Sequence, residues 1–323
     1  MINYSPDYEA LPDLVCEYLR YIDVIKNRSQ KTVFEYSINL REFITFILLD
    51  KKICNEKNLN LKICDADFFR SILLEDAYKY LSYCKNEKNN NESTRARKVV
   101  TIRQFFKYLT DNKQILESNP MKVLDSPKIK KSLPKYLTLD QSISLLESVD
   151  GKHKERDYAI LVIFLNCGLR LSELVALNYN DIRSDNSIKI RGKGNKERII
   201  YLNNACISAI NAYMRVRPTD GVIDKNALFL SSRLKRISPK TVQYIVKSFL
   251  EKSGLGEAGF SVHKLRHTAA TLMYQYGNAD VLVLKNILGH ENLSTTEIYT
   301  HIVDEQKRTA IKNNPLAKIK KTK

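Results

Sequence analysis

The chain has 323 residues, of which 43% are hydrophobic, so it is long enough for two domains of ordinary size with packed cores. No apolar run could span a bilayer, the N-terminal stretch lacks a signal peptide's apolar segment, and the six cysteines form no CxxC pair; we therefore expect a cytoplasmic protein without disulfides or a structural metal. The formal net charge of +17 indicates a polyanionic partner, and nucleic acid fits best, although a membrane surface or a ribosome would also match.

Residues 1–112 predict an all-helical domain. Apolar residues recur at helical spacing over about 14–25, and Ser29 is a suitable N-cap for a second, longer helix that includes Val33, Leu40 and Phe43. A third helix is expected over roughly 66–85 and a fourth over roughly 93–111.

The fourth of these helices has a divided surface. Val99, Ile102 and Phe106 form an apolar stripe of the kind that packs on a core, whereas basic side chains cover the remainder. These basic residues are Arg95, Arg97, Lys98, Arg103 and Lys107. By pattern alone, they either form a solvated face or contact phosphates.

Residues 113–137 are predicted to be a linker. Pro120, Pro127 and Pro134 interrupt any periodicity, and lysines are spread between them. A basic, extended connector suits a chain that must wrap around a phosphate-lined duplex.

The second domain is expected over 138–323. An apolar helix over about 155–167 ends at Gly168, which places Arg170 in the turn before the next helix. The segment 187–202 predicts a β-hairpin with a Gly-Lys-Gly-Asn turn, and 227–230 predicts a strand that could join it. Ser238 and Pro239 begin a helix that runs to about residue 253, and its Lys240, Gln243 and Tyr244 could face a DNA groove.

The segment 261–301 has the most informative polar residues. Three helices are expected in it, and His263 and Arg266 share one face at the N-terminal end of the first. His290 follows the helix-ending Gly289, and Tyr299 lies on the last helix. Arginine binds phosphate oxygens with a planar fork, histidine moves protons near neutral pH, and tyrosine can act as a nucleophile. Together they suggest a phosphate site with a covalent nucleophile, whereas a His-x-x-Arg pair alone is more often a surface or capping feature.

The order of these motifs resembles the tyrosine recombinase (phage integrase-like) family. The matching segments are Gly168-Leu169-Arg170-Leu171-Ser172-Glu173, the hairpin turn Arg191–Lys196, His263-x-x-Arg266, Leu288-Gly289-His290 and Ile298-Tyr299-Thr300. Such an ordered set is far more specific than any one of its members. The resemblance covers essentially the whole chain and is strongest from Gly168 onward.

This resemblance implies the fold and the roles of individual residues. The fold would be mainly α with a small antiparallel sheet (α+β), in which a helical N-terminal DNA-binding domain and a catalytic domain form a C-shaped clamp around DNA. Tyr299 would be the nucleophile, Arg170, Arg266 and His290 would stabilise the transition state, and His263 would take up the tyrosine proton. Lys193, with Lys196 as the alternative, would protonate the leaving 5′-oxygen, and Glu173 would orient the site, although Arg170 and Glu173 could instead be only a helix-capping ion pair. No metal or cofactor is expected.

The implied function is site-specific DNA recombination through a 3′-phosphotyrosyl intermediate and a Holliday junction. Among such enzymes the chain looks most like the bacterial Xer recombinases, which resolve chromosome dimers. The expected partners are double-stranded DNA with inverted half-sites, copies of this chain or a related recombinase in a tetramer linked by C-terminal tails, and a septal DNA translocase. The alternatives are an integrase of a mobile element, a type IB topoisomerase, and a DNA-binding accessory protein with a decayed site.

Overall fold

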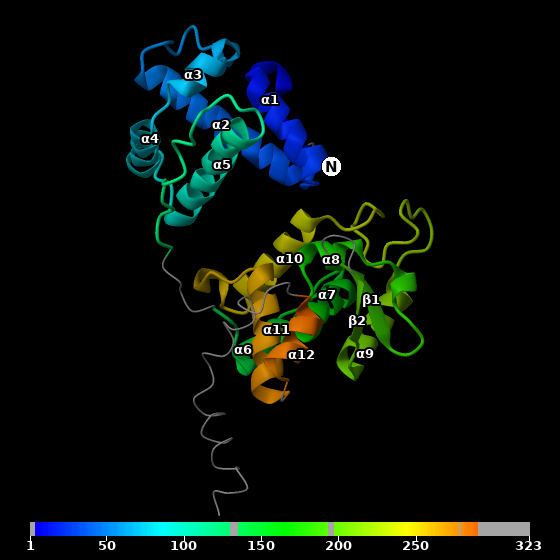
Figure 1. Cartoon of the computed structure of the whole chain (residues 1–323). Helices are drawn as coiled ribbons and strands as arrows, with labels where there is room; N and C mark the ends of the chain where they lie inside the picture. Colours follow the sequence, from blue (N-terminus) through cyan, green and yellow to red (C-terminus); the bar gives the residue numbers. More distant parts are fainter. Residues whose placement is uncertain (1–3, 130–134, 193–196, 278, 290–323) are drawn as a thin grey trace, which may run out of the picture. The chain divides into compact units, whose positions relative to one another are not determined.

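The structure, a computed structural model, describes residues 4–129, 135–192, 197–277 and 279–289. The chain divides into two compact units, Met1–Lys131 and Ser132–Lys323 (Figure 1). Across the described ranges, no helix has the length and apolar character needed to cross a membrane.

The described part of the first unit is helical. It contains α1 (Asp13–Arg20), α2 (Gln30–Asp50), α3 (Ala66–Arg70), α4 (Leu74–Asn86) and α5 (Glu92–Asp111), with a π-helix at Tyr21–Ile25 and 3-10 turns at Tyr8–Ala10 and Leu61–Ile63. Ser29 caps α2 by accepting a hydrogen bond from the backbone N–H of Thr32, as the sequence predicts.

Aromatic side chains dominate the core of the first unit. Phe43, Tyr80, Phe105 and Phe106 are almost completely buried, and neighbouring rings meet edge to face. These contacts fix one face of α2, α4 and α5 against the core. The opposite face of α5 is therefore left for solvent or for a partner.

The predicted third helix is two helices, because the chain is extended at Leu73. The Asp76 carboxylate accepts a hydrogen bond from the backbone N–H of Leu73 at 2.8 Å, which starts α4 anew. Lys51 pairs with the same carboxylate at 2.9 Å and donates to the Ser71 carbonyl at 2.7 Å. The break is thus held by a buried acid and by the lysine that follows α2, which helical periodicity cannot reveal.

The first half of the expected linker belongs to the packing of the first unit. Leu116, Met121 and Leu124 are buried in the same cluster as the aromatic core. Arg70 donates to the Ile115 carbonyl at 3.1 Å and ties this stretch to α3. The predicted domain boundaries remain predictions, but residues 115–124 are not a free connector.

The second unit is arranged around one buried helix. It contains α6 (Leu139–Glu147), α7 (Lys154–Cys167), α8 (Leu171–Ala176), α9 (Asn204–Val216), α10 (Pro239–Lys252), α11 (Val262–Tyr276) and α12 (Val281–Leu288), with 3-10 turns at Tyr179–Asp181 and Gly256–Ala258. From Ala159 to Leu165 every residue of α7 is buried, because α9 and α11 pack against it. The C-terminal end of α7 is thereby a fixed point for the residues that follow.

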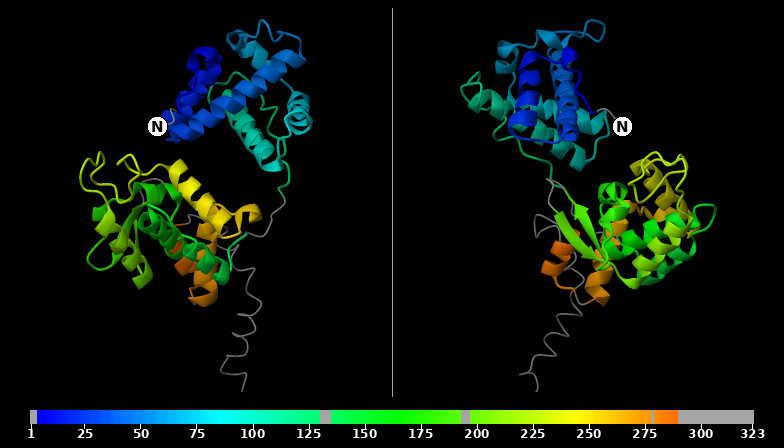
Figure 2. Two further views of the ribbon diagram at one scale, coloured as in Figure 1. Left: turned by 180° about the vertical axis from the view of Figure 1, so that it is seen from behind. Right: turned by 90° about the vertical axis from the view of Figure 1, so that its right-hand side faces the viewer.

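A β-hairpin lies beside the last described helix. Strands β1 (Ser187–Arg191) and β2 (Glu197–Tyr201) pair antiparallel, with Ile190 opposite Arg198. Figure 2 shows these strands next to α12. The prediction that 227–230 adds a third strand is wrong, because Ala227 bridges to Asn178 and Leu230 to Arg236 instead. The prediction of a mainly helical chain with a small antiparallel sheet is confirmed.

Candidate active site

The turn after α7 places Arg170 at the start of α8. Gly168 ends α7 in the left-handed region, at φ +59°, and a Cβ there would lie 2.8 Å from Leu288 Cδ2, so a larger residue would be strained and would displace Leu288. Arg170 then occupies the N-cap of α8, and its backbone N–H donates to Glu173 Oε2 at 2.8 Å. The box Gly168–Glu173 is therefore a compact turn that fixes both a guanidinium and a carboxylate.

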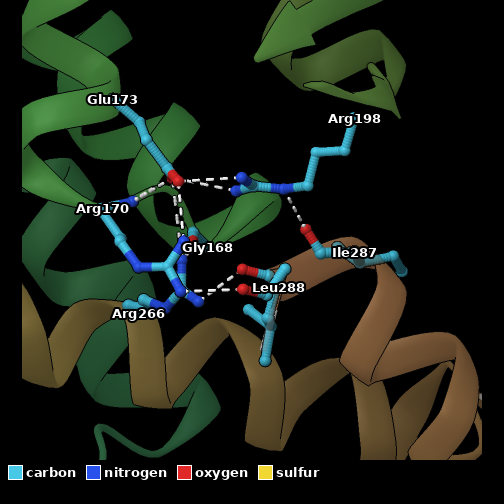
Figure 3. Close-up of polar contacts among 8 residues, drawn as sticks. Gly168, Arg170, Glu173, Arg198, Arg266, Ile287 and Leu288 are labelled. Atoms are coloured by element: carbon cyan, nitrogen blue, oxygen red, sulfur yellow. Dashed lines mark hydrogen bonds and ion pairs between the residues drawn. The ribbon is translucent and has the colours of Figure 1, made fainter. Parts of the chain in front are cut away.

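Arg266 reaches the same turn from α11. Its side chain is 3% exposed; Nη1 donates to the Gly168 carbonyl at 2.8 Å, and Nη2 donates to the Leu288 carbonyl. Arg170 Nη2 donates to the Gly289 carbonyl at 2.9 Å. The two arginines that the sequence selects are thus brought together against the end of α12 (Figure 3).

Glu173 is the buried anion that these cations surround. Oε1 accepts from Arg170 Nη1 and Arg198 Nη1, both at 2.8 Å, and Oε2 accepts from Arg198 Nη2 at 2.9 Å. Burial raises the pKa of Glu173, but hydrogen bonds from Arg198 and from the Arg170 N–H outweigh that effect and lower the pKa to about 2. Glu173 is therefore ionised at any physiological pH.

A cleft of about 600 Å³ opens beside the arginines. Arg170, His263 and Arg266 line it together with Gln243 and Lys247 of α10. Partial desolvation and the nearby charges of Arg266, Lys264 and Arg170 lower the pKa of His263. His263 is consequently neutral at pH 7 and can accept a proton. An edge-to-face contact with the His267 ring, 4.7 Å between centroids, orients it further.

Lys193, Lys196, His290 and Tyr299 lie outside the described residues. Residues adjacent to the two lysines and to His290 are described. Arg191 and Glu197, which flank the hairpin turn, pair with each other across the strands. Gly289, which precedes His290, ends α12 in the left-handed region at φ +65°. The described residues therefore show the arginines, His263 and Glu173 of the predicted site.

Two protein-family models together match this chain over most of its length. Residues 135–306 match the phage integrase family, and residues 15–113 match the N-terminal SAM-like domain of phage integrases. "Tyrosine recombinase XerC" of Caldanaerobacter subterraneus subsp. tengcongensis is 49% identical over 96% of this chain and 89% of its own length. The chain belongs to the phage integrase family of tyrosine recombinases. It is accordingly an enzyme that cleaves and rejoins DNA.

Further proteins are similar to this tyrosine recombinase in sequence or in fold. "Tyrosine recombinase XerC" of Thermodesulfovibrio yellowstonii is 35% identical over 89% of this chain and 91% of its own length. The XerH site-specific recombinase bound to a palindromic difH substrate superposes with a TM-score of 0.68 at 20% identity, covering 93% of this chain and 94% of that one. The Tn1549 transposon integrase in complex with circular intermediate DNA gives a TM-score of 0.70 at 20% identity, covering 93% and 99%. These similarities to solved structures show a shared fold.

The recombinase exposes most of the side chains that the sequence proposes for DNA contact. On α5, Arg97, Arg103 and Lys107 are exposed, whereas only 11% of the Arg95 side chain is exposed and it donates to the Asn90 carbonyl. On α10, the apolar side packs into the core, and Lys240, Gln243 and Tyr244 project from the opposite side. Tyr244 is 73% exposed.

Lys98 is a correction to that set. Its side chain is 6% exposed, pairs with the Glu42 carboxylate of α2 and donates to Tyr80 Oη at 3.1 Å. It lies next to Val99 on the side of α5 that faces the core, so it cannot be a surface phosphate contact. A basic residue beside an apolar stripe can fall on either side of the boundary, and the partners decide it here: the buried Tyr80 and the exposed Glu42 draw the Lys98 ammonium toward α2 and α4.

Sequence reasoning missed Arg198. Its side chain is 13% exposed, and its fork meets both oxygens of Glu173. A signal was present: Arg198 shares a strand face with Ile200 and lies opposite Ile190, both of which are buried. An arginine on the apolar face of a hairpin needs a buried anion, and Glu173 supplies it.

Proposed function

We propose that Tyr299 attacks the scissile phosphodiester and forms a 3′-phosphotyrosyl bond, which releases a 5′-hydroxyl. Arg170 and Arg266 stabilise the negative charge that builds on the non-bridging oxygens, and His290 donates a further hydrogen bond. His263 takes up the tyrosine proton, and Lys193 protonates the departing 5′-oxygen. The convergence of Arg170, Arg266 and neutral His263 on one cleft is the observation that supports this assignment best.

The biological reaction we propose is Xer-type resolution of chromosome dimers in the cytoplasm. Four protomers, all copies of this chain or mixed with a related recombinase, would pair two duplexes with inverted half-sites and exchange strands through a Holliday junction. Residues 1–112 would bind DNA, 113–137 would connect, and 138–323 would hold the active site and a C-terminal tail that docks on a neighbour. The support is the similarity to curated XerC proteins over nearly the whole chain. A septal DNA translocase is the proposed activator.

Mapping of covalently trapped DNA in cells tests this role. Protein–DNA adducts would be captured under denaturing conditions, and the attached DNA would be sequenced. We expect one chromosomal site with two inverted half-sites, whose occupancy depends on the translocase. Adducts at the ends of a mobile element would instead assign the enzyme to integration, and an absence of any adduct would contradict recombination by this chain.

The role of Lys193 as general acid predicts a rescue. Lys193→Ala should cleave normal DNA slowly, because a 5′-alkoxide is a poor leaving group without a proton. A substrate with sulfur at the bridging 5′ position leaves without protonation and should restore most of the cleavage rate. Lys196→Ala is the matched control, since it removes the neighbouring lysine. Equal defects of Lys193→Ala on both substrates would refute the assignment, and rescue of Lys196→Ala alone would transfer it to Lys196.

If the exposed side of α5 contacts phosphates, the affinity for DNA should fall as salt is added. The steepness of that fall should depend on the charges of α5. Each phosphate contact contributes about 0.9 to the slope of log affinity against log salt. Arg103→Ala with Lys107→Ala should flatten that slope by up to about two units for any DNA sequence. The control, Arg70→Ala with Lys79→Ala, removes equal charge from α3 and α4, where Asp67 and Glu75 already pair with these residues. Equal slopes for the two double variants would show that the basic side of α5 is only a solvated face and does not contact phosphates.

A further inference from the structure

The end of α12 is held by arginines from three different elements. Successive backbone carbonyls of Ile287, Leu288 and Gly289 accept hydrogen bonds from Arg198 Nε, Arg266 Nη2 and Arg170 Nη2 respectively. These carbonyls are the groups that a helix leaves without intrahelical partners, and the C-terminal end of a helix attracts positive charge. Arg170 and Arg266 belong to the proposed phosphate site. Arg198 binds the same helix end and is therefore part of the same hydrogen-bond network (Figure 3).

Arg198 joins that assembly from the β-hairpin. Its Nε donates to the Ile287 carbonyl at 2.8 Å while its fork binds both oxygens of Glu173. One planar guanidinium therefore links β2, α8 and the end of α12. A lysine could not make all these bonds, because it has a single nitrogen and no planar fork.

Gly289 packs directly on this guanidinium. A Cβ at Gly289 would lie 3.2 Å from both Cδ and Nη1 of Arg198 and 3.3 Å from Cζ. The glycine is thus needed for two reasons, its left-handed φ of +65° and its closeness to Arg198. Arg198 thus fixes Gly289, the residue that precedes His290 in the chain.

The sharing of Glu173 has a consequence for Arg170. Oε1 of Glu173 accepts from both Arg170 and Arg198, so its negative charge is divided between two cations. Without Arg198, the carboxylate would be left to Arg170 and Arg266, whose Nη1 lies 3.8 Å from Oε2. Those arginines would then be more strongly neutralised and turned toward Glu173 rather than toward a phosphate.

We propose that Arg198 is a positioning residue of the cleavage reaction, which binds Glu173 and the end of α12 so that Arg170 keeps its reactive arrangement. This inference rests on the proposed function in one respect, the role of Arg170 at the phosphate. Arg198 does not line the cleft and is not expected to touch DNA.

The test compares Arg198→Gln with Arg236→Gln in the full-length chain. Arg236 is a structural arginine of the same unit, which donates to the carbonyls of Val175 and Leu177 and to Asp224 and Asn178. The probe is a nicked suicide duplex with the core sequence recovered from trapped DNA, and single-turnover adduct formation is measured alongside half-site affinity and thermal unfolding. Arg198→Gln should lower the adduct rate about 10- to 100-fold at unchanged affinity. Arg236→Gln should destabilise without changing the rate per folded molecule.

A pH profile separates positioning from a general loss of stability. With Arg198 absent, Glu173 loses its main hydrogen-bond donors while it stays buried, so its pKa rises. The described charged groups that face Glu173 are then Arg170 and Arg266. Below the raised pKa the carboxylate is protonated in the variant but still ionised in the wild type, whose Glu173 has a pKa of about 2. Protonation removes the charge that neutralises Arg170, so the ratio of wild-type to variant rate should shrink as the pH is lowered. A ratio that grows or stays constant would contradict the role of Glu173.

Glycine substitutions provide an independent arm if Arg198→Gln does not fold. Gly289→Ala pushes a methyl group against the Arg198 guanidinium, whereas Gly254→Ala introduces the same backbone strain at φ +73° with nothing within 4 Å of the new Cβ. Only Gly289→Ala should slow adduct formation at unchanged affinity. Equal rates for both, or a normal rate for Arg198→Gln, would overturn the inference. A wild type that forms no adduct would instead refute the proposed function.

Discussion

Replacement of Tyr299 by phenylalanine is expected to abolish the denaturant-resistant protein–DNA adduct while half-site binding persists. The substitution removes only the hydroxyl, so the loss would be one of chemistry, because the nucleophilic oxygen is gone. A nicked suicide duplex traps the adduct, which is resolved on a denaturing gel. Tyr276→Phe is the matched control, since that side chain is 67% exposed on α11 and should tolerate the change.

Persistence of the adduct in the variant would assign the nucleophile to another tyrosine. If Tyr299→Phe still formed the adduct at the wild-type rate, Tyr299 would be the wrong tyrosine. Tyr274 and Tyr276 would then be the next candidates. Loss of both adduct and binding would instead show that Tyr299→Phe had damaged the fold, which thermal unfolding detects.

The second large effect distinguishes the two arginines of the cleft. Arg170 keeps 36% of its side chain exposed, whereas that of Arg266 is 3% exposed. Alanine at either position should slow cleavage about 10²- to 10³-fold, because one donor to the developing charge is lost. Arg266→Ala should lower the free energy of unfolding more than Arg170→Ala does, by about 1–3 kcal/mol for each of the buried Gly168 and Leu288 carbonyls left without a donor.

The comparison of Arg170→Ala with Arg266→Ala requires cleavage rates and stabilities measured on the same preparations. Adduct formation under single-turnover conditions gives the rate, and chemical denaturation gives the free energy of unfolding. Arg236→Ala, which removes a structural arginine that does not line the cleft, should lower stability and leave the rate of the folded fraction unchanged. A fast Arg170→Ala enzyme would contradict phosphate stabilisation by Arg170, and equal stability losses would contradict the burial argument for Arg266.

Local signals in the sequence predict much of the fold. The Ser29 cap, the Gly168 stop, the hairpin and the Ser238-Pro239 helix start are each set by neighbouring residues, and the structure confirms them. The break before α4 was not predictable, because it depends on Lys51, a residue more than twenty positions away. The strand expected at 227–230 failed for the same reason, since its partners are Asn178 and Arg236.

The candidate site shows the same division. Arg170, Glu173, His263 and Arg266 could be selected by motif. The described structure brings the two arginines and Glu173 together near the end of α12 and places His263 in the same cleft as the arginines. Arg198 escaped because its partner Glu173 lies 25 residues earlier in the chain, and strand patterning alone does not name a partner. Lys98 was misassigned because helical spacing gives only an approximate boundary between the core and solvent faces.

The attachment point of DNA on the protein tests the central claim most directly. Wild-type enzyme trapped on a suicide duplex would be digested with trypsin and nuclease, and the nucleotide-bearing peptide would be identified by mass spectrometry. Cleavage after lysine and arginine gives peptide 286–307, whose only tyrosine is Tyr299, and peptide 267–285, which contains Tyr274 and Tyr276. We predict the nucleotide on 286–307, at Tyr299. A nucleotide on 267–285, or on any other peptide, would contradict the proposed mechanism.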